Sequence, residues 1–101
     1  MLNPLLTFQP EELSALCSRY RVRTLYIFGS ATRMDFKDDS DVDIMVEFDS
    51  GHEPGLFHLV QMKDELEVLF ARPVDLSTPE ILANPFRRAS IVKDLERLYG
   101  S

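Results

Sequence analysis

The feature that most constrains this chain is a Gly-Ser pair followed, after a loop of ten residues, by an Asp-x-Asp triplet. Gly29 and Ser30 end one apolar run, residues 25–28, and Asp41 and Asp43 open another. Both runs are rich in β-branched and aromatic residues, which is typical of strands. The pattern therefore predicts two strands whose connection carries a glycine at one end and paired acids at the other.

The paired acids indicate a metal site. Residues two apart in a strand point to the same face, so Asp41 and Asp43 are expected to project together. The opposite face is then an apolar stripe of Val42, Ile44, Val46 and Phe48. Two neighbouring carboxylates repel each other unless a cation lies between them, and oxygen ligands of this kind suit Mg²⁺ or Mn²⁺. Taken alone, the same pair is also typical of a solvated edge strand.

The Gly-Ser pair indicates a phosphate-binding turn. Gly29 allows a sharp turn and a close approach of the backbone to a ligand. Ser30 offers a hydroxyl and an N–H at the start of a short helical turn, where the helix dipole favours anions. Arg33 follows in the loop, where it is expected either to reach a triphosphate or to be an ordinary surface arginine. The loop acids Asp35, Asp38 and Asp39 are expected to be solvated.

A third acid, Asp75, lies in a short apolar run, Val74-Asp75-Leu76, that is expected to form a third strand. We expect this carboxylate to converge with those of Asp41 and Asp43 on one metal-binding cleft. The combination of the Gly-Ser pair, the loop of fixed length and the Asp-x-Asp triplet makes the interpretation specific, and the third acid strengthens it.

The combination Gly29-Ser30-x10-Asp41-x-Asp43 with a later Asp75 resembles the DNA polymerase beta-like nucleotidyltransferase superfamily. The length and layout resemble its minimal nucleotidyltransferases (MNT), over most of the chain. The resemblance implies an α/β (α+β) fold of the polymerase beta-like type, with a small mixed β-sheet and flanking helices.

The resemblance also implies a mechanism. Asp41, Asp43 and Asp75 are expected to hold two Mg²⁺ ions, with Mn²⁺ as an alternative, against the triphosphate of ATP. Gly29 and Ser30 are expected to bind the β- and γ-phosphates. An acceptor hydroxyl then attacks the α-phosphorus and pyrophosphate leaves.

The acceptor is not given by the motif. Larger members of the superfamily carry further domains that hold it, so a small acceptor or a second protein is expected here. MNT proteins pair with HEPN-domain RNases, which implies an antitoxin that transfers AMP from ATP to a tyrosine of such a toxin. Two other functions stay open, namely a non-catalytic nucleotide-binding module that inhibits a partner, and transfer to a small molecule such as an antibiotic.

The tail residues that offer apolar surface to a partner, or to the core, are Phe86, Ile91, Leu95, Leu98 and Tyr99. Core packing is favoured for Ile91, Leu95 and Leu98.

Composition sets outer limits. The chain has 101 residues, which predicts one domain over residues 1–101. Its net charge of -6 argues against binding to a nucleic-acid backbone. No apolar run approaches the ~20 residues of a membrane span, and the N-terminus lacks a signal-peptide pattern, so a cytoplasmic protein is expected. The single cysteine, Cys17, is expected to be a buried structural thiol, and His52 and His58 are expected at the surface.

Periodicity and turn residues predict the remaining elements. The longest predicted helix covers residues 56–70, and its polar face is expected to be solvated or partner-facing. This face carries Lys63, Asp64, Glu65 and Glu67. Helices are expected from Thr7–Pro10 to Tyr20, over 56–70 and over 86–93, with short helical turns at 30–34 and from Pro79, the latter capped by Thr78. Strands are expected at 22–28, 41–48, 74–76 and 95–99, with a loop at 49–55.

Overall fold

A four-stranded mixed β-sheet organises the fold, as seen in a computed structural model that describes residues 2–100. The strand order is β3-β2-β1-β4; β1 is antiparallel to β2 and β4, and β2 is parallel to β3. The elements are α1 (Pro10–Arg19), β1 (Val22–Phe28), the 3-10 turn η1 (Gly29–Thr32), β2 (Val42–Phe48), α2 (Leu56–Phe70), β3 (Val74–Ser77), the 3-10 turn η2 (Pro79–Ala83), α3 (Pro85–Asp94) and β4 (Glu96–Gly100). The predicted mixed sheet with flanking helices is confirmed.

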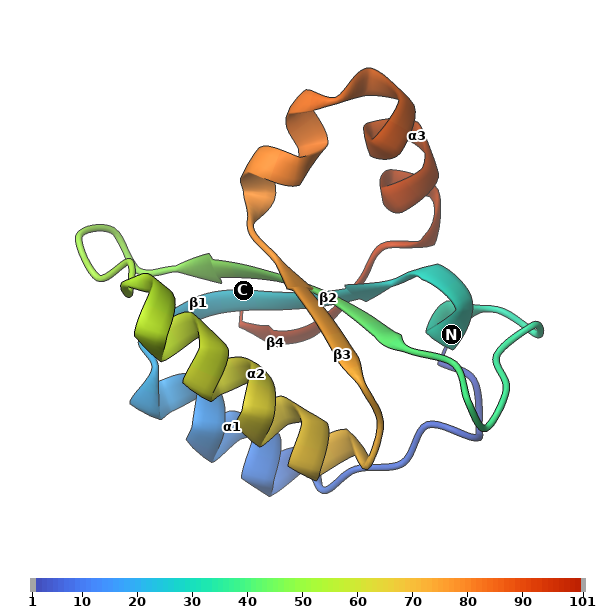
Figure 1. Cartoon of the computed structure of the whole chain (residues 1–101), viewed down its shortest axis with the longest axis horizontal. Coiled ribbons are helices and arrows are strands. Elements are labelled where there is room, and N and C mark those ends of the chain that lie inside the picture. Colours follow the sequence, from blue (N-terminus) through green and yellow to red (C-terminus); the bar gives the residue numbers. More distant parts are fainter. Residues whose placement is uncertain (1, 101) are drawn as a thin grey trace.

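The main core lies between one face of the sheet and the helices α1 and α2, which Figure 1 shows below the sheet. The antiparallel register pairs Ile27 with Ile44 and Leu25 with Val46, and all four side chains are fully buried. Alternation along the strands therefore sends these apolar residues to one face, as the sequence predicts. The helices complete this core with Leu13, Leu16, Cys17, Met62, Leu66 and Phe70.

The other face of the sheet is covered by η2 and α3, drawn in orange and red above the sheet in Figure 1. Phe28, Met45 and Ile91 form a second, smaller cluster of buried residues there. The segment that carries η2 and α3 runs from β3 to β4, which are the two edge strands of the sheet. The sheet is thus sandwiched, and α3 lies against β1 and against the turn η1 that follows it.

Two acids on the polar face of α2, a face predicted to be solvated or partner-facing, are partly exposed and also make contacts within the protein. Glu65 accepts hydrogen bonds from the hydroxyl of Tyr20 and from Arg19 at 2.8 Å. Glu67 accepts from the backbone N–H of Val74 at 2.8 Å and from Lys63 at 3.1 Å. A helical pattern identifies the polar face, but not the neighbouring helix or strand that this face meets.

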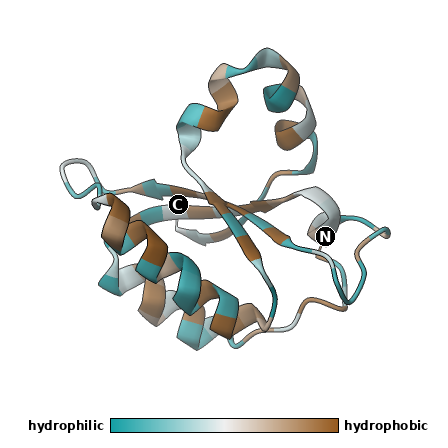
Figure 2. Cartoon of the chain, in the orientation of Figure 1, coloured by the Kyte–Doolittle hydropathy of each residue, from teal (hydrophilic) through white to brown (hydrophobic). Residues whose placement is uncertain are grey.

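Large apolar residues also remain exposed on α2, whose ribbon carries hydrophobic colour along its length in Figure 2. They are Leu56, Phe57, Val60 and Val68. None of the helices in residues 2–100 is long and apolar enough to span a membrane.

The predicted element boundaries hold closely. β1 and α2 have the predicted bounds, whereas α1 begins at Pro10 and η1 ends at Thr32. Thr78 occupies the cap position of η2, but its side chain makes no capping bond and instead donates to the carboxylate of Glu80. The side-chain oxygen of Asn84 caps α3 by accepting hydrogen bonds from the backbone N–H groups of Phe86 and Arg87.

Single-residue predictions are mostly confirmed. Cys17 is buried, and burial raises the pKa of its thiol to about 12. His52 and His58 are exposed. In the tail, Ile91 is buried while Leu95, Leu98 and Tyr99 pack partly buried against the two cores, but Phe86 is 88% exposed. Met1 and Ser101, the ends of the predicted domain, lie outside the described residues.

Candidate functional site

Asp43 of β2 and Asp75 of β3 are directly paired in the parallel register. Paired residues of neighbouring strands project from the same face, so these carboxylates leave the sheet side by side. Asp43 is half-buried and Asp75 is exposed. The predicted strand begins at Asp41, but β2 begins at Val42, so Asp41 lies just before the strand and is exposed. The register therefore brings together two acids that are far apart in the sequence.

The environment of Asp43 disfavours its negative charge. Burial, followed by the charges of Asp75 and Asp41, raises the pKa of the Asp43 carboxyl, while Arg33 and Arg87 act in the opposite direction. No hydrogen bond within residues 2–100 involves this carboxylate. A half-buried acid that lacks a donor and lies near two other acids is a site that a cation would stabilise.

The donor chemistry fits a hard divalent cation. As the side chains stand, residues 2–100 contain no group of three or more His, Cys, Asp or Glu that could hold a metal ion. Mg²⁺, however, is usually held by one or two carboxylates together with water and substrate phosphates. The paired Asp43 and Asp75 meet that requirement, and a role for Asp41 as a third ligand stays a prediction.

Gly29 lies directly against Asp43. Its φ of +76° is in the left-handed region, and a Cβ built on it would be 2.3 Å from Oδ2 of Asp43. Glycine is therefore required here both by the backbone conformation and by the close approach. The turn is closed by Thr32, whose hydroxyl donates to the carbonyl of Gly29 at 2.8 Å, and by the N–H of Arg33, which donates to the carbonyl of Ser30 at 2.9 Å.

Asn3 anchors the turn from the N-terminal segment. Its backbone N–H donates to the carbonyl of Ala31 at 2.7 Å, and its side-chain amide donates to the carbonyl of Arg33 at 2.7 Å. The residue is 9% exposed. Sequence reasoning missed this contact, because a single asparagine near a terminus carries no signal of such a long-range partner.

Arg72, just before β3, anchors the loop between the turn and the paired acids. Its guanidinium carbon lies 4.2 Å from the ring centre of the buried Phe36. It also donates to the carbonyl of Lys37 at 2.6 Å and to that of Ser40 at 3.3 Å. These contacts explain why the loop has a defined path despite its exposed acids, and they too were missed from the sequence.

A cavity of about 480 Å³ opens between the turn and α3. This volume lies within the usual range of small-molecule sites. Four predicted site residues line it, namely Gly29, Ser30, Arg33 and Asp43, together with Phe28, Phe86, Arg87, Ser90 and Ile91. Asp41 and Asp75 are not among the lining residues. The contribution of α3 was missed, although two adjacent arginines after a helix start are notable in so acidic a chain.

The predicted phosphate ligand Arg33 already has carboxylate partners. Its Nε and Nη2 donate to Asp35 at 3.0 and 3.3 Å, and its Nη1 donates to Asp94 at the end of α3. The side chain therefore ties the turn to α3 across the wall of the cavity.

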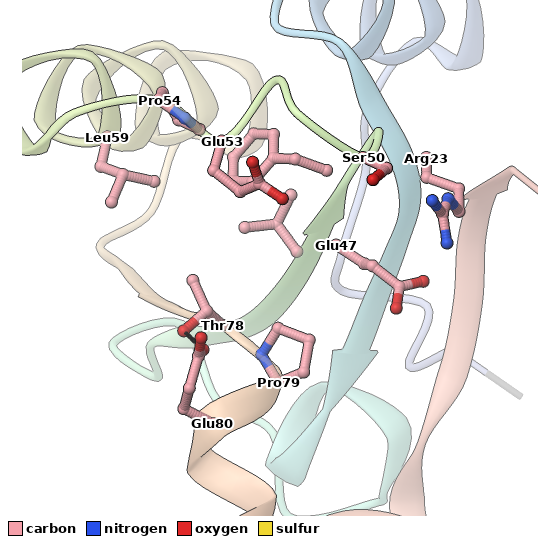
Figure 3. A pocket seen from close by; sticks show the side chains of 11 residues that line it. Arg23, Glu47, Ser50, Glu53, Pro54, Leu59, Thr78, Pro79 and Glu80 are labelled. Atoms are coloured by element: carbon pink, nitrogen blue, oxygen red, sulfur yellow. Dashed lines mark hydrogen bonds between the residues drawn. The ribbon is translucent and has the colours of Figure 1, made fainter.

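A second cavity, of about 450 Å³, lies at the opposite end of β2. Figure 3 shows Glu47, Glu53 and Glu80 around it, with Arg23 at its rim. Three carboxylates against one guanidinium would repel a triphosphate. The cavity beside Gly29 and Asp43 is therefore the candidate nucleotide site.

Comparison with known proteins agrees with this geometry. The model of the nucleotidyltransferase domain family matches residues 11–98. Protein adenylyltransferase MntA of Thermococcus cleftensis is 37% identical over 75 residues, which cover 74% of this chain and 71% of that protein. The candidate protein adenylyltransferase MJ1379 of Methanocaldococcus jannaschii is 36% identical over 80 residues, covering 79% of this chain and 80% of the relative.

Solved structures share the fold. A candidate minimal nucleotidyltransferase superposes with a TM-score of 0.67 at 29% identity, covering 86% of each chain. A toxin–antitoxin complex with AMP-PNP gives a TM-score of 0.71 at 19% identity, covering 92% of this chain and 74% of the other. An MNT antitoxin complex with a tri-AMPylated HEPN toxin of Shewanella oneidensis gives 0.63 at 18% identity, covering 91% and 70%. Together with the glycine turn, the paired acids and the cavity between the turn and α3, these matches establish that the chain belongs to the nucleotidyltransferase domain family.

Proposed function

We propose that this protein is a protein adenylyltransferase that moves AMP from ATP to a tyrosine of a HEPN-domain RNase toxin and thereby acts as its antitoxin. The observation that carries the proposal is the pairing of Asp43 with Asp75 beside a cavity lined by Gly29 and Ser30. The names of the relatives support adenylyl transfer to protein, and the toxin–antitoxin complexes of like fold support the partner. The proposed setting is the cytoplasm, where ATP is available, with the chain acting as a single domain.

The turn would bind the triphosphate. Gly29 has no side chain, so phosphate oxygens can approach the backbone N–H groups closely. The hydroxyl of Ser30 lines the same cavity and can donate to a β- or γ-phosphate oxygen. Arg33 forms part of the wall and ties it to α3 through Asp94.

We propose that two Mg²⁺ ions, or Mn²⁺ in their place, would be held by Asp41, Asp43 and Asp75. When bound, the metal neutralises charge on the phosphates and on the departing pyrophosphate. The unpartnered, half-buried carboxylate of Asp43 supports this assignment, because such a group gains most from a bound cation.

The transfer would exchange one phosphorus–oxygen bond for another. The oxygen of the tyrosine hydroxyl bonds to the α-phosphorus, and the bond from that phosphorus to the oxygen bridging to the β-phosphate breaks. Pyrophosphate leaves with the electron pair. The exposed carboxylate of Asp75 accepts the proton of the hydroxyl, since it lies on the same sheet face as Asp43 and is open to an acceptor.

The test is a transfer assay with α-labelled ATP and Mg²⁺, with and without the HEPN partner. Label is expected on a tyrosine of the partner with the unchanged protein and with Asp64→Asn, an exposed acid on α2 that serves as matched control. Asp43→Asn is expected to give none. Full transfer by a folded Asp43→Asn protein would sink the proposal.

The same assay separates the alternatives. A stable complex with the partner but without any labelling would indicate a non-catalytic inhibitor. With aminoglycosides added to the assay, label on these compounds and none on the partner would indicate a small-molecule transferase.

A further inference from the structure

We propose that Arg87 of α3, rather than Arg33 of the turn, is the cation that contacts the β- and γ-phosphates of bound ATP. The inference rests on the proposed function, because it requires a nucleotide in the cavity beside Gly29. It names a binding residue that the motif does not contain, on the opposite wall of the site.

The first step is that Arg33 is already neutralised. All three of its guanidinium nitrogens donate to carboxylates, two to Asp35 and one to Asp94. Two carboxylates already offset the charge of Arg33, so a triphosphate would compete with both of them for this side chain, and Asp94 is nearly buried, with a side chain 9% exposed. Leaving such an acid unpaired is costly. Arg33 is therefore better suited to hold α3 against the turn.

The second step is that Arg87 is available. It lines the same cavity as Ser30 and Asp43. Within residues 2–100, no ion pair or hydrogen bond occupies its guanidinium; only its backbone N–H is used, by the side chain of Asn84. Its charge acts on the nearby Asp43 without a direct contact, so the N–H donors of the guanidinium can offer a phosphate two parallel hydrogen bonds.

The third step is that α3 is fixed with this residue facing the cavity. Arg87 and Ile91 are four residues apart and so share one helical face. Ile91 is 4% exposed and packs with Phe28 and Met45 of the sheet. Ser90, three residues after Arg87, lines the cavity as well. The buried isoleucine thus sets the rotation of the helix that presents Arg87 and Ser90.

The neighbouring Arg88 provides a matched control. It lies on the same helix and is exposed, but it does not line the cavity. Arg87 and Arg88 differ in direction rather than in chemistry, so a general effect of positive charge would appear equally in both variants.

The experiment measures binding of α,β-methylene-ATP and of AMP by calorimetry in the presence of Mg²⁺. The methylene bridge prevents cleavage at the bond that adenylyl transfer breaks. For Arg87→Gln we expect affinity for the analogue to fall at least about tenfold, because charge-assisted hydrogen bonds are lost. AMP affinity should stay unchanged, since AMP lacks the β- and γ-phosphates, and Arg87→Lys should restore part of the loss.

The controls make the outcome decisive. Arg88→Gln is expected to bind both nucleotides like the unchanged protein. Arg33→Gln is expected to weaken both alike, because it loosens the wall of the cavity rather than removing a phosphate contact. Unchanged thermal melting confirms that each variant is folded.

Two results would overturn the inference while leaving the proposed function intact. They are equal analogue affinity for Arg87→Gln and Arg88→Gln, and an AMP affinity lowered as much as that for the analogue. Failure of the unchanged protein to bind either nucleotide would instead remove the proposed function, and this inference with it.

Discussion

Oδ2 of Asp43 occupies the space that the first side-chain atom of any other residue at position 29 would need, since a Cβ on Gly29 would lie only 2.3 Å away. The proposed phosphate turn and the proposed metal ligand are therefore packed against each other. A side chain at position 29 would therefore displace the carboxylate of Asp43, which places a steric condition on the motif in addition to a chemical one.

Gly29→Ala should lower transfer by about 10²-fold or more, because displacement of a reacting group by about 1 Å has that effect. The left-handed backbone adds about 1–3 kcal/mol of strain. Gly51→Ala is a matched control, because Gly51 also has a positive φ, of +80°, but a Cβ there meets no atom within 4 Å. Transfer rates and melting temperatures of the two variants separate the clash from the strain. Equal activity of both would contradict a steric role for Gly29.

Asp43→Asn should abolish transfer and should not destabilise the metal-free protein. The substitution removes a half-buried negative charge that lies near Asp75 and Asp41 and has no hydrogen-bond donor within residues 2–100. Urea unfolding without added metal should therefore give a midpoint equal to or above that of the unchanged protein. A clear loss of stability would indicate a structural role for the carboxylate instead.

Glu65→Gln should destabilise the protein at neutral pH by about 1 kcal/mol or less, since the ion pair is partly solvated. Hydrogen bonds from Tyr20 and Arg19 lower the pKa of Glu65 in the folded state. The stabilisation is therefore present above the ordinary glutamate pKa and is lost as pH falls through the folded-state value. Denaturation at pH 7 and in acid should show the two proteins converging at low pH. Asp64→Asn, on the exposed part of the same helix, should differ little from the unchanged protein at either pH.

Arg72→Ala should free the loop that links the turn to the paired acids. Its stacking on Phe36 and its bonds to the carbonyls of Lys37 and Ser40 are lost together, at a cost of about 1–3 kcal/mol. Faster amide exchange over residues 36–41 and slower transfer are expected. Arg72→Lys should restore little, because an ammonium cannot reproduce both contacts. Exchange rates like those of the unchanged protein would show that the loop is held by other contacts.

The sequence predicts local structure well where one periodicity dominates. The bounds of β1 and α2 match because strand-like and helical patterns are clear there. The sequence could predict that Asp43 and Asp75 converge, but it could not predict that they are directly paired. Strand register depends on contacts between segments that are far apart in the sequence. The roles of Glu65 and Glu67 depend on which elements α2 meets, and helical periodicity does not specify neighbours.

The candidate site was predictable on one wall only. Gly29, Ser30 and Asp43 belong to a compact motif, and they line one cavity. The wall formed by Phe86, Arg87 and Ser90 exists only once α3 packs on Met45 and Phe28, and no short-range pattern encodes that docking. The metal-binding and phosphate-binding roles themselves stay predictions for the experiments above.

The connection from β3 to β4, residues 78–95, leaves one edge of the sheet, passes over its face and returns to the other edge (Figure 1). Because this segment is continuous with a strand at each end, α3 cannot open about a single hinge. Any tilt of α3 changes the backbone where the segment joins β3 or β4. The first of these junctions directly follows the strand that carries Asp75. A tilt of α3 would therefore be transmitted to the strand that carries Asp75, and the exposed Phe86 near the start of this helix is a point where such a tilt could be imposed from outside.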